Sequence, residues 1–172
     1  YDILSDGFAV VAASEIVTFN DPNLEATVRG ALGKPVGDIT ADDMATFITL
    51  GADWRGIRDL SGLEYAVNLQ TLYISNNQIS DLSPLAGLTN LQTLWLQDNQ
   101  VSDLSPLAGL TNLQRLWLNQ NQIRDVSPLA GLTNLRELLL AVNQISDLSP
   151  LAGLTNLGYV QLYRNQISDL SP

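Results

Sequence analysis

The chain has 172 residues, of which 18 are acidic and 8 basic, giving a formal net charge of −10 at pH 7. So acidic a surface repels phosphate, and we expect no nucleic-acid partner and no attraction to anionic membranes. Cysteine and histidine are both absent, which excludes disulfides, thiol chemistry, zinc sites with the usual ligands, and every catalytic dyad or triad that needs His or Cys.

Residues 1–20 are interpreted as a β-prone extension that lies outside any repeat. Val, Ile and Phe are concentrated in residues 8–13 and 15–19, a composition that favours short strands. Residues 8–13 could alternatively be the tail of a signal sequence, although no basic segment precedes them. No stretch of the chain approaches the length of a transmembrane helix, so we expect no membrane insertion.

Residues 21–65 predict a small helical cap followed by a degenerate first coil. Asp21 is suited to cap a helix that begins with proline, and Gly33 is suited to end it. Thr40 is expected to cap a second helix, with Asp43 completing an imperfect capping box. The residues after this second helix already align with the repeat that follows. A cap is needed here because the first coil of a stack would otherwise expose a row of leucines.

Residues 66–172 repeat with a step of 22 residues, in four full copies and one incomplete copy that no C-terminal cap follows. Such a period is typical of a solenoid. Leu94-Trp95-Leu96 alternates inward, outward and inward, which predicts a short strand that pairs in parallel with its neighbours. Ser105 is expected to cap a turn that ends at Gly109, and this turn is short enough to be 3₁₀. We predict an α/β solenoid with the parallel sheet on the concave side and 3₁₀ turns on the convex side.

Two polar columns run through the repeats. The asparagine column consists of Asn77, Asn99, Asn121, Asn143 and Asn165. An amide that points inward beside leucines must be satisfied by the backbone, so this column is predicted to be a structural ladder. The aspartate column consists of Asp81, Asp103, Asp125, Asp147 and Asp169. These carboxylates could bind calcium, but each precedes a Ser-Pro turn, where Asp commonly accepts local backbone N–H bonds. We favour that local role and expect no metal and no cofactor.

The pattern Leu-x-x-Leu-x-Leu-x-x-Asn-x-Ile/Val-x-Asp-Leu-x-x-Leu-x-x-Leu-Thr-Asn closely resembles the leucine-rich repeat of bacterial internalins and related surface proteins. The resemblance covers about residues 20–172, and the pair of N-terminal helices is similar to the cap of that group. It implies a right-handed solenoid used for protein recognition, typically in adhesion, and therefore an extracellular or bacterial cell-surface location. Internalins usually close with a C-terminal cap or an immunoglobulin-like module, which the sequence does not contain.

The copies differ mainly on the strand and just after it, at positions expected to face outward from the concave sheet. The candidate ligand-binding residues are therefore Tyr73, Trp95, Trp117, Arg115, Glu137, Leu139, Tyr159 and Tyr163. The first three would form a solvent-facing aromatic file. Such a file fits the anchors of an interface with a protein or glycan. It also fits mutual stacking that stabilises the sheet, and the two interpretations are compatible.

The last, incomplete coil suggests an alternative. Its apolar residues would have no following coil to cover them: Leu157, Val160, Leu162, Ile167 and Leu170. We expect such an end face to be covered, either by further chain or by another molecule. Residues 8–19 of a second copy could add to the open sheet edge, and this head-to-tail contact would not close on itself.

The sequence thus predicts a non-catalytic recognition or adhesion module that uses its concave face. The alternative is a structural subunit that stacks head to tail into a filament or surface layer, or an idealised repeat scaffold. An enzyme is the least favoured class, because no nucleophile–base pair involving His or Cys is possible and the acidic residues lie in turn columns.

Overall fold

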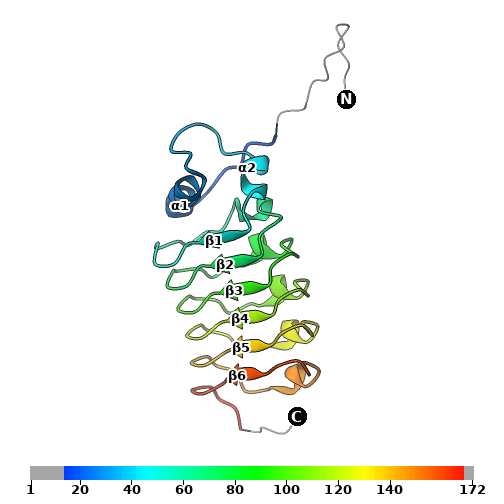
Figure 1. Ribbon diagram of the computed structural model, residues 1–172. Coiled ribbons are helices and arrows are strands. Elements are labelled where there is room, and N and C mark those ends of the chain that lie inside the picture. The colour runs from blue at the N-terminus through cyan, green and yellow to red at the C-terminus, as the bar shows by residue number, and fades with distance from the viewer. Residues whose placement is uncertain (1–13, 169–172) are drawn as a thin grey trace, which may run out of the picture.

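The structure, a computed structural model, describes residues 14–168 and shows a stack of coils with one sheet of six parallel strands along its side (Figure 1). The strands follow one another in chain order and are β1 Thr49–Gly51, β2 Thr71–Tyr73, β3 Thr93–Trp95, β4 Arg115–Trp117, β5 Glu137–Leu139 and β6 Tyr159–Gln161. The register joins Leu72 to Leu94 and Leu94 to Leu116, so equivalent residues of successive repeats lie side by side. The predicted solenoid is confirmed.

Short 3₁₀ turns line the other side of the stack, as predicted. They span Leu63–Tyr65, Ser83–Leu85, Ser105–Leu107, Ser127–Leu129 and Ser149–Leu151. The expectation that serine caps these turns is wrong, because serine is the first residue inside each of the last four turns, and the leucine or valine at the cap position makes no side-chain hydrogen bond. The aspartate two residues earlier takes the backbone N–H instead: Asp81 Oδ1 accepts from Ser83 at 2.8 Å.

The same contact recurs at Asp103, Asp125 and Asp147, each 2.8 Å from the N–H of the serine two residues on. Hydrogen bonds from the side chain and backbone of Ser105 lower the pKa of Asp103, because they favour the charged form. Asp169 lies outside the described residues. Within residues 14–168 no three acidic side chains gather where they could hold a metal ion. The backbone hydrogen bonds of the four described aspartates give them the local role favoured from the sequence.

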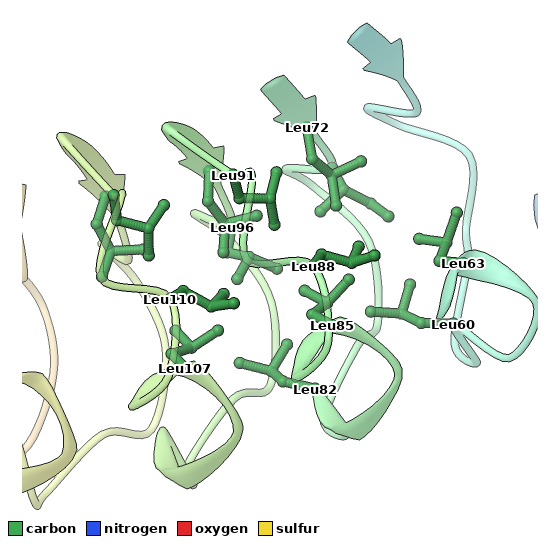
Figure 2. Close-up of a cluster of buried hydrophobic side chains, with 14 of the residues drawn as sticks. Leu60, Leu63, Leu72, Leu82, Leu85, Leu88, Leu91, Leu96, Leu107 and Leu110 are labelled. Carbon is green, nitrogen blue, oxygen red and sulfur yellow. The ribbon is translucent and has the colours of Figure 1, made fainter. Parts of the chain in front are cut away.

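Leucines fill the interior of every coil. Side chains from the strands and from the turns point toward one another, as Leu72, Leu88 and Leu85 do in Figure 2, and all three have no exposed surface. Each coil therefore buries its apolar side chains against the coils before and after it, which is how a solenoid is stabilised.

The asparagine column is a ladder that satisfies the backbone, as predicted. Asn121 Oδ1 accepts the N–H of Val101 at 2.9 Å, and Asn121 Nδ2 donates to the carbonyls of Leu96 and Leu118 at 3.0 and 3.1 Å. Asn77, Asn99, Asn143 and Asn165 make the same kind of contacts with their own neighbouring coils. These amides hydrogen-bond backbone groups that the three-residue strands leave unpaired.

Two helices, α1 Pro22–Leu32 and α2 Ala41–Ala45, lie beyond the first strand (Figure 1). Asp21 caps α1 through Oδ1, which accepts the N–H groups of Asn23 and Leu24 at 2.8 and 3.1 Å. Its other oxygen accepts the N–H of Arg58 at 2.7 Å, which ties α1 to the first coil. Burial acts to raise the pKa of Asp21, but the backbone hydrogen bonds outweigh it and lower that pKa. The capping box of α2 is present, with Asp43 accepting the N–H of Thr40 at 2.8 Å.

Residues 14–19, which come before the expected cap, pack against it. The N–H of Val17 donates to the carbonyl of Ile39 at 2.8 Å, and an isolated antiparallel bridge joins Ile16 to Thr40. Phe19 lies so close to Gly62 that a Cβ added there would be 2.6 Å from its ring. The segment 8–13 lies outside the described residues. None of the helices in the described part of the chain is both long and apolar enough to span a membrane.

Candidate functional site

The outward side of the sheet carries the residues in which the repeats differ, and we call it the sheet face. It consists of the first and third residue of each strand and the residue two positions after each strand. In β4 these are Arg115, Trp117 and Asn119. The register places each of them directly beside its equivalents on the neighbouring coils.

The aromatic file predicted from the sequence is present at the centre of the sheet face. The ring centroids of Tyr73 and Trp95 are 4.4 Å apart with a tilt of 56°. Those of Trp95 and Trp117 are 4.0 Å apart and nearly parallel, at 4°. All three side chains are half-buried. Mutual stacking is therefore real, and it leaves mainly ring edges exposed to solvent.

The two indole N–H groups of the aromatic file differ in their hydrogen-bond partners. Trp117 Nε1 donates to Glu137 Oε1 at 2.9 Å, and Arg115 Nε lies 3.8 Å from the other carboxylate oxygen of Glu137. Trp95 Nε1 is buried and has no partner. The register explains this contrast. Glu137 is on the strand next to Trp117, and the equivalent position next to Trp95 holds Arg115. A carboxylate can accept the indole N–H, but a guanidinium cannot accept a hydrogen bond.

The other predicted binding residues differ in exposure. Tyr159 and Tyr163 are 51% and 61% exposed, and Arg115 is exposed as well. Leu139 is only 6% exposed. It lies in register between Trp117 and Gln161, whose side chains flank it. Leu139 is therefore on the outward side of the sheet, as expected, but its side chain is nearly covered and forms part of the floor of the sheet face.

The residue three positions after each strand has a left-handed backbone conformation, which the repeat pattern did not predict. The φ angles are between 55° and 59° for Trp54, Asn76, Asp98, Gln120, Val142 and Arg164. These variable positions were expected to point outward from the sheet, and four of them line a groove together with residues of the sheet face: Asp98, Gln120, Val142 and Arg164. Asparagine and aspartate tolerate this conformation, so Asn76 and Asp98 were the available sequence signal.

A groove of about 280 Å³ runs along the edge of the sheet face. It is lined by Gln97, Asp98, Asn119, Gln120, Val142, Tyr163 and Arg164. Three of its six polar side chains are amides, which can both donate and accept hydrogen bonds. Gln97 Oε1 is buried without a partner among the described residues.

The predicted end face lies on the last described coil. Val160 is 38% exposed, whereas its strand partner Leu138 has no exposed surface. Leu157, Leu162 and Ile167 are half-buried. Leu170 lies outside the described residues.

Comparison with known proteins agrees with this architecture. The family model described as leucine-rich repeats (2 copies) matches residues 67–109, 89–131 and 133–172. A search of curated proteins gave no match. Among solved structures, an internalin (inlF) from Listeria monocytogenes is 32% identical with a TM-score of 0.85, covering 94% of this chain and 49% of that one. An internalin C2 of the same species is 36% identical with a TM-score of 0.53, covering 96% and 94%.

A further neighbour, the functional domain of InlJ from Listeria monocytogenes, is 24% identical with a TM-score of 0.71, covering 94% of this chain and 41% of that one, and shows the fold alone. The present chain spans about half the length of the first internalin, at 49%. The repeat pattern, the parallel sheet with its 3₁₀ turns, and these matches lead to one conclusion: the chain belongs to the leucine-rich repeat family and is internalin-like.

Proposed function

We propose that the protein is a non-catalytic recognition module that binds a protein partner through the sheet face, which we take to be the concave side of the solenoid. The observation that carries this proposal is the aromatic file of Tyr73, Trp95 and Trp117. Tyr and Trp are the residues most often found as energetic anchors of interfaces. Here they stand between charged and polar groups, Arg115 and Glu137 on one side and the amide-lined groove on the other.

The ring geometry favours a protein partner over a glycan. A sugar ring packs against the face of an aromatic ring, but the facing sides of Trp95 and Trp117 are closed by their 4.0 Å contact. The side of Trp95 that faces Tyr73 is partly closed by the 4.4 Å contact. Ring edges carry partial positive charge, so the exposed edges suit carbonyl and carboxylate oxygens and the apolar side chains around them. Such groups are abundant on a protein surface.

The likeness to internalins supports an extracellular or cell-surface location in a bacterium, with adhesion as the biological setting. It also supports a non-catalytic role, because members of this family are typically recognition modules. The location, the adhesive setting and the non-catalytic role are parts of this proposal, because the chain spans 49% of the first internalin's length.

Affinity capture with paired variants tests the proposal. The chain is immobilised and incubated with host-cell surface extract, and captured proteins are compared between the wild type and a Trp95→Ser/Trp117→Ser variant. The control variant changes Arg124 and Gln144 to Ser, an exposed hydrogen-bonded pair outside the sheet face. We expect capture to survive the control and to be lost in the tryptophan variant while thermal melting remains cooperative. A partner retained equally by both variants would refute use of the sheet face.

Head-to-tail assembly has less support than recognition. In its favour, Val160 is exposed on the last described coil. Against it, Glu15, Val17 and Phe19 of the segment expected to add to that edge are engaged within the molecule's own cap. Light scattering at high concentration separates the two alternatives: growing particles favour assembly, and a constant monomer mass favours recognition.

A further inference from the structure

A hollow lies between α1 and the first coil, away from the aromatic file. It has a volume of about 610 Å³ and is lined by Asn23, Ala26, Thr27, Gly30, Ala31, Gly51, Trp54 and Arg55. Hollows of this size are large enough to hold an organic group. We call it the cap groove.

The walls of the cap groove are fixed relative to each other. Asp21 joins the start of α1 to the first coil through the N–H of Arg58 at 2.7 Å. Asn23 Nδ2 reaches the carbonyl of Gly56 at 3.4 Å, across the end of the groove. Helix α1 buries Leu24 and Val28 completely on its other side. The groove is therefore built into the cap and does not depend on a mobile segment.

Small residues leave the groove open. Ala26, Gly30 and Ala31 form the helix wall, and a Cβ built on Gly30 or on Gly51 would meet nothing within 4 Å. Gly51 also stands at the place in the sheet where Tyr73 has its ring, because the two are register partners. The aromatic file therefore stops at β1, and the space it would have filled belongs to the groove.

Trp54 is difficult to explain by the folding of this molecule alone. It is 77% exposed, so it contributes little to the core. Its φ of 59° places a bulky side chain in the left-handed region, a conformation that costs free energy for residues other than glycine and asparagine. The five equivalent residues of the other coils share this conformation, so it is a property of the repeat, and the exposed indole is what sets Trp54 apart. An exposed indole on the rim of a groove lined with small residues is suited to receive a flat apolar group.

Arg55 supplies the charge at the groove. Its side chain is exposed and forms no ion pair with any residue from 14 to 168. Residues 14–109 carry twelve acidic and four basic side chains, and of these four Arg29 and Lys34 form ion pairs, whereas the guanidinium of Arg55 is free to pair with a ligand. A guanidinium of this kind pairs best with a carboxylate.

We propose that the cap groove is a second binding site, which takes an aromatic side chain next to a carboxylate in a peptide segment of a protein partner. The aromatic ring packs against the indole of Trp54 over the small residues of α1. The carboxylate pairs with Arg55. The site does not depend on use of the sheet face.

Indole N–H resonances provide a direct test, because the chain has three tryptophans and a Trp54→Phe variant identifies the signal of Trp54. The uniformly ¹⁵N-labelled chain is titrated with the blocked peptide Gly-Phe-Asp-Gly, with Gly-Phe-Lys-Gly, and with Gly-Ala-Asp-Gly. We expect a saturable shift of the Trp54 signal with the first peptide and weaker binding with the second, by up to about fivefold, which is the upper end for an exposed ion pair. The third peptide should give no saturable shift.

Two variants complete the test. Gly51→Phe fills the groove from a position where the added side chain meets open space, and it should abolish the shift. Arg55→Gln should make the first two peptides bind equally. In the Trp95→Ser/Trp117→Ser variant the Trp54 shift should persist, which separates this site from the sheet face. If Gly51→Phe does not fold, Arg55→Gln alone decides. An unmoved Trp54 signal, or equal binding of all three peptides to the wild type, would overturn the proposal.

Discussion

Replacing Asn121 with Ala isolates one rung of the asparagine ladder. The wild-type side chain is buried and joins its own coil to the preceding one: Oδ1 accepts the N–H of Val101, and Nδ2 donates to the carbonyls of Leu96 and Leu118. The two carbonyls keep a second amide partner in the variant, because Leu96 also accepts from Asn99 and Leu118 from Asn143. Only the N–H of Val101 loses its partner.

The expected loss of stability follows from the one N–H group that is left without a partner. A buried N–H without a partner costs about 1–3 kcal/mol, and the weakened bonds to the two carbonyls add a smaller amount. We therefore expect Asn121→Ala to lower the free energy of unfolding by about 2–3 kcal/mol. For a chain of this size, 1 kcal/mol corresponds to roughly 2–4 °C in Tm, so the melting temperature should fall by about 4–12 °C.

The matched control is Asn112→Ala, which makes the same chemical change at an exposed amide whose single bond goes to the carbonyl of Thr89 at 2.9 Å. Water can replace that bond, so a loss of at most about 1 kcal/mol is expected. Urea unfolding followed by circular dichroism measures both variants, with equal m-values required for the comparison. If Asn121→Ala is no more destabilising than Asn112→Ala, the ladder does not have the role assigned to it.

Three further predictions concern single residues. Val142→Asn should raise the free energy of unfolding by about 0.5–1 kcal/mol, because a β-branched residue is strained at φ 59°; unchanged urea stability would contradict this. Gly62→Ala should lower the free energy of unfolding by about 2 kcal/mol or more, because the φ of Gly62 is 103° and the added Cβ would be 2.6 Å from the Phe19 ring. The control is Gly87→Ala, whose added Cβ meets nothing within 4 Å, and it should be near neutral in the same assay. Asp21→Asn should destabilise most above about pH 4. The folded pKa of Asp21 is lowered from 3.8, so its contribution is fully present above the unfolded pKa and is lost as the pH falls through the folded pKa. A stability difference that stays constant down to pH 2 would exclude that linkage.

The parts of the fold that depend on local rules could be predicted from the sequence. The step between repeats determines the register of the sheet, and Asp21 and Thr40 cap their helices through contacts within three residues. The asparagine ladder could be predicted because an amide among leucines must find backbone partners. Each of these inferences needs only neighbours at a fixed distance along the chain.

The parts that were missed depend on the size of neighbouring side chains or on backbone conformation. Leu139 lies on the outward side of the sheet as expected, but the side chains that flank it in the sheet leave it only 6% exposed. The left-handed turn after each strand was hidden because its positions hold residues as different as Trp54 and Val142. The cap groove depends on how α1 packs against the first coil, which no repeat pattern encodes.

The positions of buried polar atoms that lack a hydrogen-bond partner support the proposal that the sheet face is the binding surface. Inside the coils the amides of the asparagine ladder find backbone partners, whereas the described side-chain atoms that are buried without a partner are Ser75 Oγ, Trp95 Nε1 and Gln97 Oε1. All three belong to the sheet face. Natural proteins depart from complete hydrogen-bond satisfaction mainly where function requires it. A surface that stacks its aromatic rings yet leaves polar groups beneath them unpaired is better explained by binding than by stability.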